Sequence, residues 1–337
     1  MRKLILTMLF CLTMSLFFPC YSAPANNRIR GSTYQGRSYL FLYDIAGFYG
    51  LRIHRSGEVF TLTSGRGHRL VFNVNKRIGS INGINVTYLF APVLKNGYPY
   101  ISEMDFRRVL EPALRRVTLP RREVKTIMID PGHGGKDKGA PGPNGVWEKQ
   151  IALAISRRLQ KALREKGYTV FMTRSGDRYP SLQDRVNMRG GAKADILLSI
   201  HCNASAQKNT TGIETFAATP VGAASSSDKK VSFTKFSGND FDHLNYRLAY
   251  EIQRQLITKT KAVDRGVKHA RFYVIKNAAC PAVLIETGFL SNPREGIILQ
   301  TAKRQQEITE AIVDGVQRFC YAVKPVKKAE KRNARRR

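Results

Sequence analysis

Two different hydrophobic patterns divide the chain near residue 120. In the second half, continuous apolar runs of strand length alternate with segments whose apolar residues recur at helical spacing. This alternation predicts an α/β domain, a mainly parallel sheet with helices on both faces. The expected strands are KTIMIDPG (125–132), YTVFMTR (168–174), ADILLSIHC (194–202), GIETFAA (212–218), RFYVIK (271–276) and AVLIETGF (282–289), and the expected helices cover 147–167, 181–194, 242–260 and 301–319.

The first half follows a shorter, β-rich pattern. Runs such as EVFTLTS, HRLVFNV, GINVTYL and YPYIS are separated by Asn-Gly and Ser-Gly turn signals, and a short helical pattern stands on each side of them. A small β-rich module is therefore expected before the α/β domain.

The ends and junctions of the chain are polar or highly charged. Residues 1–23 carry two basic residues, an apolar run and small residues after it, which is typical of a secretory signal rather than a membrane span. The predicted organisation is a signal peptide (1–23), a linker (24–36), the β-rich module (37–115), a second linker (116–124), the α/β catalytic domain (125–322) and a basic disordered tail (323–337).

Charge and cysteine content limit the possible functions. The formal net charge of +31 indicates attraction to a polyanion, and export favours an anionic wall polymer or membrane over nucleic acid. The basic residues also lack the interleaved aromatic residues of a single-strand binder. Cys202, Cys280 and Cys320 remain after the signal, an odd count that gives no disulfide framework. Cys202 and Cys280 both lie at strand edges and could meet, but all three are expected to be apolar fillers.

Polar residues gather at the carboxyl ends of the expected strands. His133 follows the first strand in DPGHGG, Glu148 opens the next helix, His201 ends the third strand and Glu286 ends the last. Ligands and substrates bind at this edge of a parallel sheet. Two imidazoles and a carboxylate form the ligand set of a catalytic zinc, and a second carboxylate is what hydrolysis needs as general base and acid.

The motifs of residues 124–321 together resemble the zinc-dependent N-acetylmuramoyl-L-alanine amidases of bacterial cell walls. They are IDPGHGGKDKGA, Glu148 fifteen residues after His133, LLSIHCNAS, GIETF, DRGVKHARFYVIK and PAVLIETGFLSNPRE. The resemblance implies one Zn²⁺ held by His133, Glu148 and His201, with Glu286 as the catalytic carboxylate. It further implies peptidoglycan as substrate, regulators of cell division or the envelope as partners, and a location in the periplasm or cell envelope.

The segment 37–115 resembles the small module named after the N-terminal domain of copper amine oxidases. Its histidines, His54 and His68, are isolated and indicate no copper. The module is expected to act as a spacer or a wall contact.

Other interpretations stay open from the sequence. Residues 219–243 are Ser/Lys/Gly-rich, which predicts a flexible loop where regulated family members insert an inhibitory helix. Ser-x-x-Lys, the nucleophile motif of penicillin-binding enzymes, occurs at 226–229 and 232–235 in this region and at 205–208 just before it. The alternatives are a zinc peptidase acting within the stem peptide, a dual enzyme with a serine carboxypeptidase activity, and a wall-binding protein without catalysis.

Overall fold

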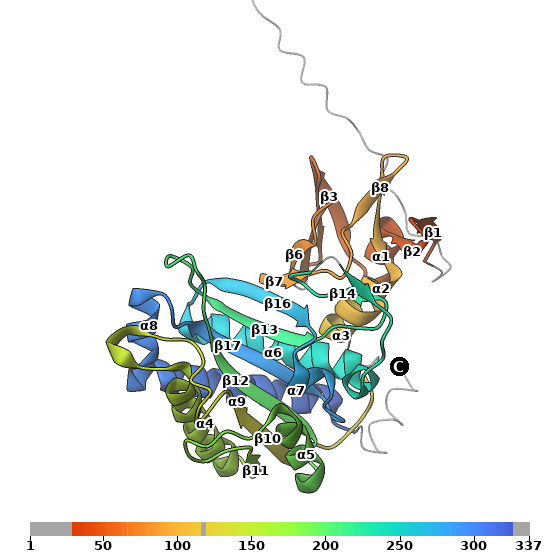
Figure 1. The fold of residues 1–337 in the computed structure, drawn as a ribbon. Coiled ribbons are helices and arrows are strands. Elements are labelled where there is room, and N and C mark those ends of the chain that lie inside the picture. The colour runs from red at the N-terminus through yellow and green to blue at the C-terminus, as the bar shows by residue number, and fades with distance from the viewer. Residues whose placement is uncertain (1–28, 66, 116–118, 229, 326–337) are drawn as a thin grey trace, which may run out of the picture.

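The structure is a computed structural model that describes residues 29–65, 67–115, 119–228 and 230–325 (Figure 1). The predicted signal peptide and nearly all of the predicted basic tail lie outside these ranges. Among the described residues, no helix has the length and apolar character needed to cross a membrane.

The α/β domain is built on six strands in the order β11-β10-β12-β17-β13-β16. Neighbouring strands are parallel except for β13 and β17, which are antiparallel, so the predicted mainly parallel sheet is confirmed. The strands are β10 (Thr126–Pro131), β11 (Thr169–Met172), β12 (Ile196–Asn203), β13 (Ile213–Ala218), β16 (Asp264–Ala270) and β17 (Ala282–Phe289).

Helices cover both faces of this sheet, as the strand pattern predicted (Figure 1). Helices α4 and α6 pack on one face and α9 packs against both of them, whereas α5 and α7 lie on the other face. The helices are α4 (Glu148–Glu165), α5 (Leu182–Ala192), α6 (Asp242–Thr260), α7 (Tyr273–Lys276), α8 (Pro293–Leu299) and α9 (Ala302–Val323), with 3₁₀ turns η3 (Pro143–Gly145) and η4 (Ser237–Phe241).

Helix α4 illustrates how the sequence produces this packing. Its apolar residues Ile151, Ile155, Leu159 and Leu163 recur every fourth position and are all buried. This spacing places them on one stripe of the helix, which packs on β10, β11 and β12. The first residue of α4 is thereby fixed at the carboxyl end of those strands.

The N-terminal module is β-rich, as predicted. One sheet has the order β1-β2-β9-β8, and strands β3 to β7 form an antiparallel ribbon. The elements are β1 (Gly31–Tyr34), β2 (Arg37–Phe41), α1 (Leu42–Phe48), β3 (Arg52–Ser56), β4 (Val59–Thr63), β5 (Arg69–Asn73), β6 (Ile78–Ile81), β7 (Ile84–Thr87), β8 (Val93–Lys95), β9 (Tyr98–Ser102), α2 (Glu103–Asp105), η1 (Phe106–Leu110) and α3 (Glu111–Leu114).

The module and the α/β domain share a sheet. Strand β7 pairs in parallel with β16 through Val86 and Val267, so the module's ribbon extends the catalytic sheet to eleven strands (Figure 1). His269 of β16 is buried at this seam and stacks on Tyr246. The Tyr250 hydroxyl donates a hydrogen bond to the Ile81 carbonyl across it. The module is therefore packed against the catalytic domain.

Three details differ from the sequence expectations. Residues 31–34 of the predicted linker 24–36 form strand β1, because they pair with β2. The expected strand 271–276 is helix α7 over Tyr273–Lys276, and the neighbouring strand is β16 instead. Residues 219–243, expected to form a flexible loop, contain a hairpin of β14 (Ala223–Ala224) and β15 (Val231–Ser232), followed by η4.

Candidate metal centre and active site

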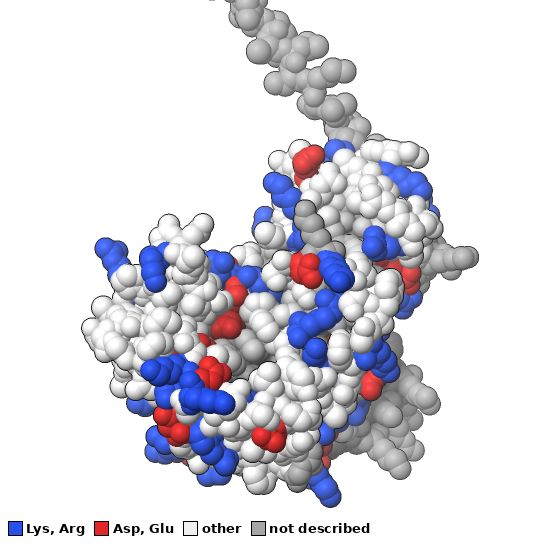
Figure 2. Space-filling model, in the orientation of Figure 1, with Lys and Arg blue, Asp and Glu red and all other residues white. Residues whose placement is uncertain are grey.

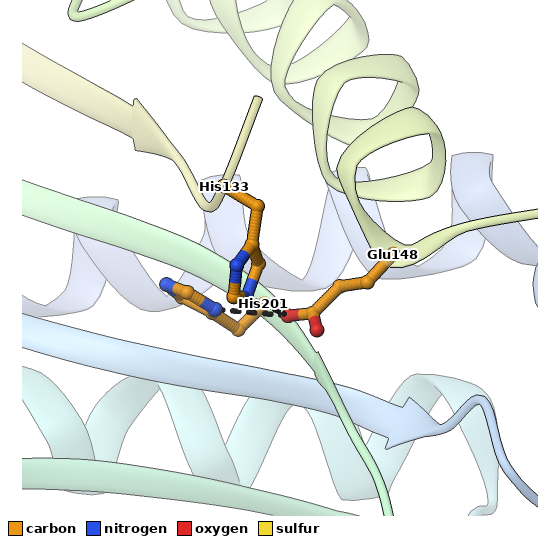
Figure 3. A group of neighbouring side chains, drawn as sticks. All are labelled: His133, Glu148 and His201. Carbon is orange, nitrogen blue, oxygen red and sulfur yellow. Dashed lines mark hydrogen bonds and ion pairs between the residues drawn. The ribbon is translucent and has the colours of Figure 1, made fainter. Parts of the chain in front are cut away.

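Three of the predicted residues meet at the carboxyl edge of the sheet. His133 lies in the loop after β10, Glu148 is the first residue of α4, and His201 is on β12. Glu148 Oε1 lies 3.1 Å from His133 Nε2 and 2.9 Å from His201 Nδ1. One ligand atom from each residue falls within 4.8 Å of the other two, and Figure 3 shows the side chains pointing toward one another.

The glycines around His133 permit this close approach. A Cβ atom at Gly132 would lie 2.3 Å from the His201 ring, and one at Gly139 would lie 2.6 Å from Glu148 Oε2. Distances this short exclude any larger residue without movement of a ligand side chain. His133 itself has a φ of 59°, a left-handed conformation that costs energy in a residue with a side chain.

Two buried arginines hold the loop in place. Arg174 is fully buried and donates to the carbonyls of Pro131, Gly132 and Lys149, at 3.0, 2.7 and 2.8 Å respectively. Arg185 donates to the His133 carbonyl at 2.7 Å and forms an ion pair with buried Asp130 at 2.8 Å. The backbone strain at His133 is thus offset by charge-assisted hydrogen bonds.

Glu148 is held in its ionised form. Its oxygens accept hydrogen bonds from the Cys202 N–H at 3.0 Å and from the Ala140 N–H at 2.9 Å, at the positive end of helix α4. Burial raises the pKa of Glu148, but hydrogen bonds and charge from both histidines lower it more, so the net pKa lies well below the usual range. An ionised carboxylate between two imidazoles has the donor set of a divalent metal site.

Asp137 orients one of the two imidazoles. Its Oδ2 lies 2.9 Å from His133 Nδ1, on the ring side opposite Glu148. Burial lowers the pKa of His133, whereas Glu148 and then Asp137 raise it, with a net rise. A carboxylate behind a ligating histidine fixes the ring and its tautomer in many metal sites. Asp137 was not predicted from the sequence, although its position four residues after His133 was a usable signal.

Glu286 lies beside the cluster without taking part in it. It occupies β17 in register with His201 on one side and with Glu214 on the other. Its Oε2 is buried and has no hydrogen-bond partner among the described residues. Burial first, and then the charges of Glu148 and Glu214, raise the pKa of Glu286 well above its ordinary value. A carboxyl group in this state is suited to accept and release a proton.

A cavity of about 960 Å³ opens at Glu286 and runs toward the N-terminal module. Figure 2 shows this face hollowed, with acidic residues in the hollow and basic residues on the wall toward the module. The cavity is large enough for several residues of a peptide substrate.

The remaining sequence candidates have structural roles or stay predictions. Ser205 and Ser232 accept backbone hydrogen bonds from Gln207 and Thr234, and Ser226 accepts one from the His269 N–H. A Ser-x-x-Lys nucleophile is presented at the start of a helix. Ser205, Ser226 and Ser232 all lie outside the described helices and therefore lack this position. Of the three cysteines expected to be apolar fillers, Cys202 and Cys280 are buried and Cys320 is partly buried, and all three are free thiols.

A two-histidine, one-carboxylate cluster beside a second, protonatable carboxylate is the arrangement found in metal-dependent hydrolases. A comparison with protein families is specific: residues 127–318 match the model described as N-acetylmuramoyl-L-alanine amidase. The chain belongs to this family, as the sequence resemblance indicated.

Relatives and solved structures agree with this assignment. The chain is 40% identical to the N-acetylmuramoyl-L-alanine amidase LytC of Bacillus subtilis over 57% of its length, and 33% identical to AmiA of Escherichia coli over 57%. These matches span 34% of LytC and 75% of AmiA. The amidase AmiC2 of Nostoc punctiforme matches with a TM-score of 0.50 at 29% identity, over 58% of this chain and 97% of that chain. The family match does not include the N-terminal module, so its resemblance to the copper amine oxidase module stays a prediction.

Proposed function

We propose that the chain is a zinc-dependent amidase, in which His133, Glu148 and His201 hold the metal and Glu286 is the catalytic carboxylate. The observation that carries the proposal is the difference between the two carboxyl groups. Glu148 is ionised and lies between two imidazoles. Glu286, on the strand next to that of His201, has an oxygen without a hydrogen-bond partner among the described residues and a raised pKa. The first is suited to hold a metal and the second to carry a proton.

The bond cleaved is the amide between the lactyl group of N-acetylmuramic acid and the L-alanine of the stem peptide. Bound zinc would supply Lewis-acid activation of water and of the scissile carbonyl. Glu286 accepts the proton of the attacking water and delivers it to the departing amine of alanine. Glu148 stays ionised throughout, because the backbone N–H groups of Ala140 and Cys202 stabilise its charge. The products are a peptide-free glycan and a free stem peptide.

We place this activity outside the cytoplasm, in remodelling of the wall or splitting of the septum during division. The apolar segment at residues 1–23 supports export, and the excess of basic residues supports retention at an anionic wall. Regulators of division or of the envelope are the expected protein partners.

The test is mass spectrometry of the products from a defined muropeptide, with protein as purified, treated with a chelator, and reloaded with zinc. We expect free stem peptide beginning at L-alanine, loss of product after chelation and recovery with zinc. Cleavage inside the stem peptide would show a peptidase instead. Binding of peptidoglycan without any cleavage would show a wall-binding protein.

A further inference from the structure

One wall of the cavity beside Glu286 comes from the N-terminal module. Asn75, Lys76 and Arg77, in the turn before β6, line it together with Thr87 at the end of β7. The opposite part of the lining includes Glu214 and Glu286 of the catalytic strands. Lys76 of the module and Glu286, the proposed proton carrier, therefore line the same cavity.

The floor of this cavity is continuous sheet. Strands β17, β13, β16, β7 and β6 follow one another in that order, so four steps separate Glu286 from the module's turn. Adjacent strands lie about 4.8 Å apart, which gives roughly 19 Å. An extended peptide spans about 3.3–3.6 Å per residue, so this length accommodates about five residues.

The two ends of the cavity differ in charge. At the catalytic end, Glu214 is paired with Lys268 and Arg265. At the module end, the guanidinium group of Arg77 donates to the carbonyls of Tyr88, Ala224, Ser225 and Asp228, and Arg271 donates to the carbonyl of Ala223 and the hydroxyl of Ser225.

These acceptors are neutral, so neither arginine forms an ion pair through them; the acidic groups whose charge acts on the two arginines are Asp105 for Arg77 and Asp228 for Arg271. Lys76 is exposed and forms no ion pair with the described residues. Asp228 is the acidic lining residue at this end, against three cations. The module end therefore keeps a net positive charge.

Aromatic side chains occupy the stretch between the ends. Phe216 of β13 and Phe272 contact each other edge to face, with ring centroids 5.1 Å apart. They give the middle of the cavity an apolar surface that suits short aliphatic side chains. Acid–base groups, an apolar stretch and a cationic end thus follow one another along the floor.

We propose that this module end is the distal subsite of the substrate groove, where Lys76 and Arg271 bind the carboxylates at the far end of the stem peptide. The inference rests on the proposed amidase function, since it places the scissile amide at Glu286. It gives the N-terminal module a direct part in substrate recognition, in addition to any role as a spacer.

The test compares Lys76→Glu with wild-type full-length protein on three substrates. They are a muramoyl pentapeptide, the same pentapeptide with its distal carboxylates amidated, and the truncated muramoyl-L-alanine. Lys76→Glu should lower kcat/KM for the free pentapeptide by roughly fivefold through a higher KM, and leave the other two substrates unchanged. Lys166→Glu is the matched control, because Lys166 is exposed beyond the far end of α4, about 27 Å from Glu148.

Each other outcome has a definite meaning. Equal kcat/KM values for Lys76→Glu and wild type on the free pentapeptide would overturn the subsite, as would an equal loss on all three substrates or the same loss in Lys166→Glu. Failure of the wild-type protein to cleave any of the three would instead count against the amidase function itself.

Discussion

The candidate metal cluster and the module end of the cavity beside it hold charge in opposite ways. At the cluster of His133, Glu148 and His201, called the metal end below, an anion is surrounded by donors. Glu148 accepts from two backbone N–H groups and lies against two imidazoles. At the module end, Arg77 and Arg271 donate only to carbonyl and hydroxyl oxygens. The first arrangement concentrates lone pairs for a cation, and the second leaves positive charge for an anion.

The two ends also differ in how the chain builds them. The metal end is largely local, because the loop 132–147 connects β10 directly to Glu148, and only His201 comes from elsewhere in the chain. The module end joins segments far apart in sequence, the turn at 75–77, the hairpin at 223–232 and the residues after β16. A local site leaves a motif in the sequence, whereas a site assembled across domains leaves none.

The largest effect is expected from Glu286→Gln. The amide matches the carboxyl group in shape but can neither accept the proton of the attacking water nor deliver one to the leaving amine, so the variant should fold, keep its metal and lose hydrolysis by about 10²–10⁴-fold in kcat. Metal content by mass spectrometry and muropeptide turnover measure the two properties. Glu310→Gln, which changes an exposed carboxylate on α9, is the control. Full activity of Glu286→Gln would assign the proton transfer to another group.

The seam where β7 of the module pairs with β16 of the α/β domain should make the stability of the protein sensitive to acid. Burial, and then the charge of Arg77, lower the pKa of His269 to about 3, although its hydrogen bond to the Thr87 backbone opposes this shift. The unfolded histidine titrates near 6.5, so below that pH the unfolded state takes up a proton that the folded state excludes. Stability is therefore lost as pH falls from 6.5 toward 3, by about 3–5 kcal/mol at most for this group.

His269→Gln should flatten this dependence. Urea unfolding between pH 7 and pH 4 measures the slope of the unfolding free energy against pH, and the variant's slope should be shallower than that of the wild type. His54→Gln, at an exposed position on β3, should keep the wild-type slope. Equal slopes in His269→Gln and wild type would show that His269 does not carry the effect.

The elements predicted correctly from the sequence are those whose apolar residues recur at a regular helical spacing or form a continuous run of strand length. Helix α4 and strands β10, β12 and β17 lie within a few residues of their expected bounds, and the four selected polar residues come together because parallel strands end at one edge. The helix α7 was missed, because RFYVIK is as apolar as a strand and only its packing against β13 and β17 decides the conformation. Strand β16, DRGVKHA, was missed because it is polar and short of continuous apolar residues.

The contacts that support the site could not be predicted from the sequence. Arg174 and Arg185 follow later elements and act through backbone carbonyls, which no spacing rule reveals. The pairing of β7 with β16 joins two segments about 180 residues apart and depends on a single strand edge. The module's place in the active-site wall could be found only from the structure.

Asp137→Asn should lower the affinity of the site for zinc, an effect smaller than those expected for Glu286→Gln and His269→Gln. Asp137 contacts the ring nitrogen of His133 that faces away from Glu148, and its charge fixes the ring orientation. Loss of such a carboxylate typically lowers metal affinity by about 10–100-fold. Competition with a zinc-binding dye measures the affinity. Asp177→Asn is the matched control, because Asp177 contacts Gly135 and Lys149 of the same region but neither histidine. Unchanged zinc affinity in Asp137→Asn would remove Asp137 from the metal site.

The smallest effect is expected from Arg77→Lys, which separates charge from geometry at the module end. Lysine keeps the positive charge but has one nitrogen in place of the two guanidinium nitrogens that reach the carbonyls of Ser225 and Ala224, so the hairpin should loosen by about 1 kcal/mol. Faster hydrogen exchange at residues 223–228 reports this change, with Arg52→Lys on the exposed strand β3 as the control. Since the charge stays, the preference for free stem-peptide carboxylates should largely persist. Unchanged exchange in the hairpin would show that Arg77 is not what holds it against the module.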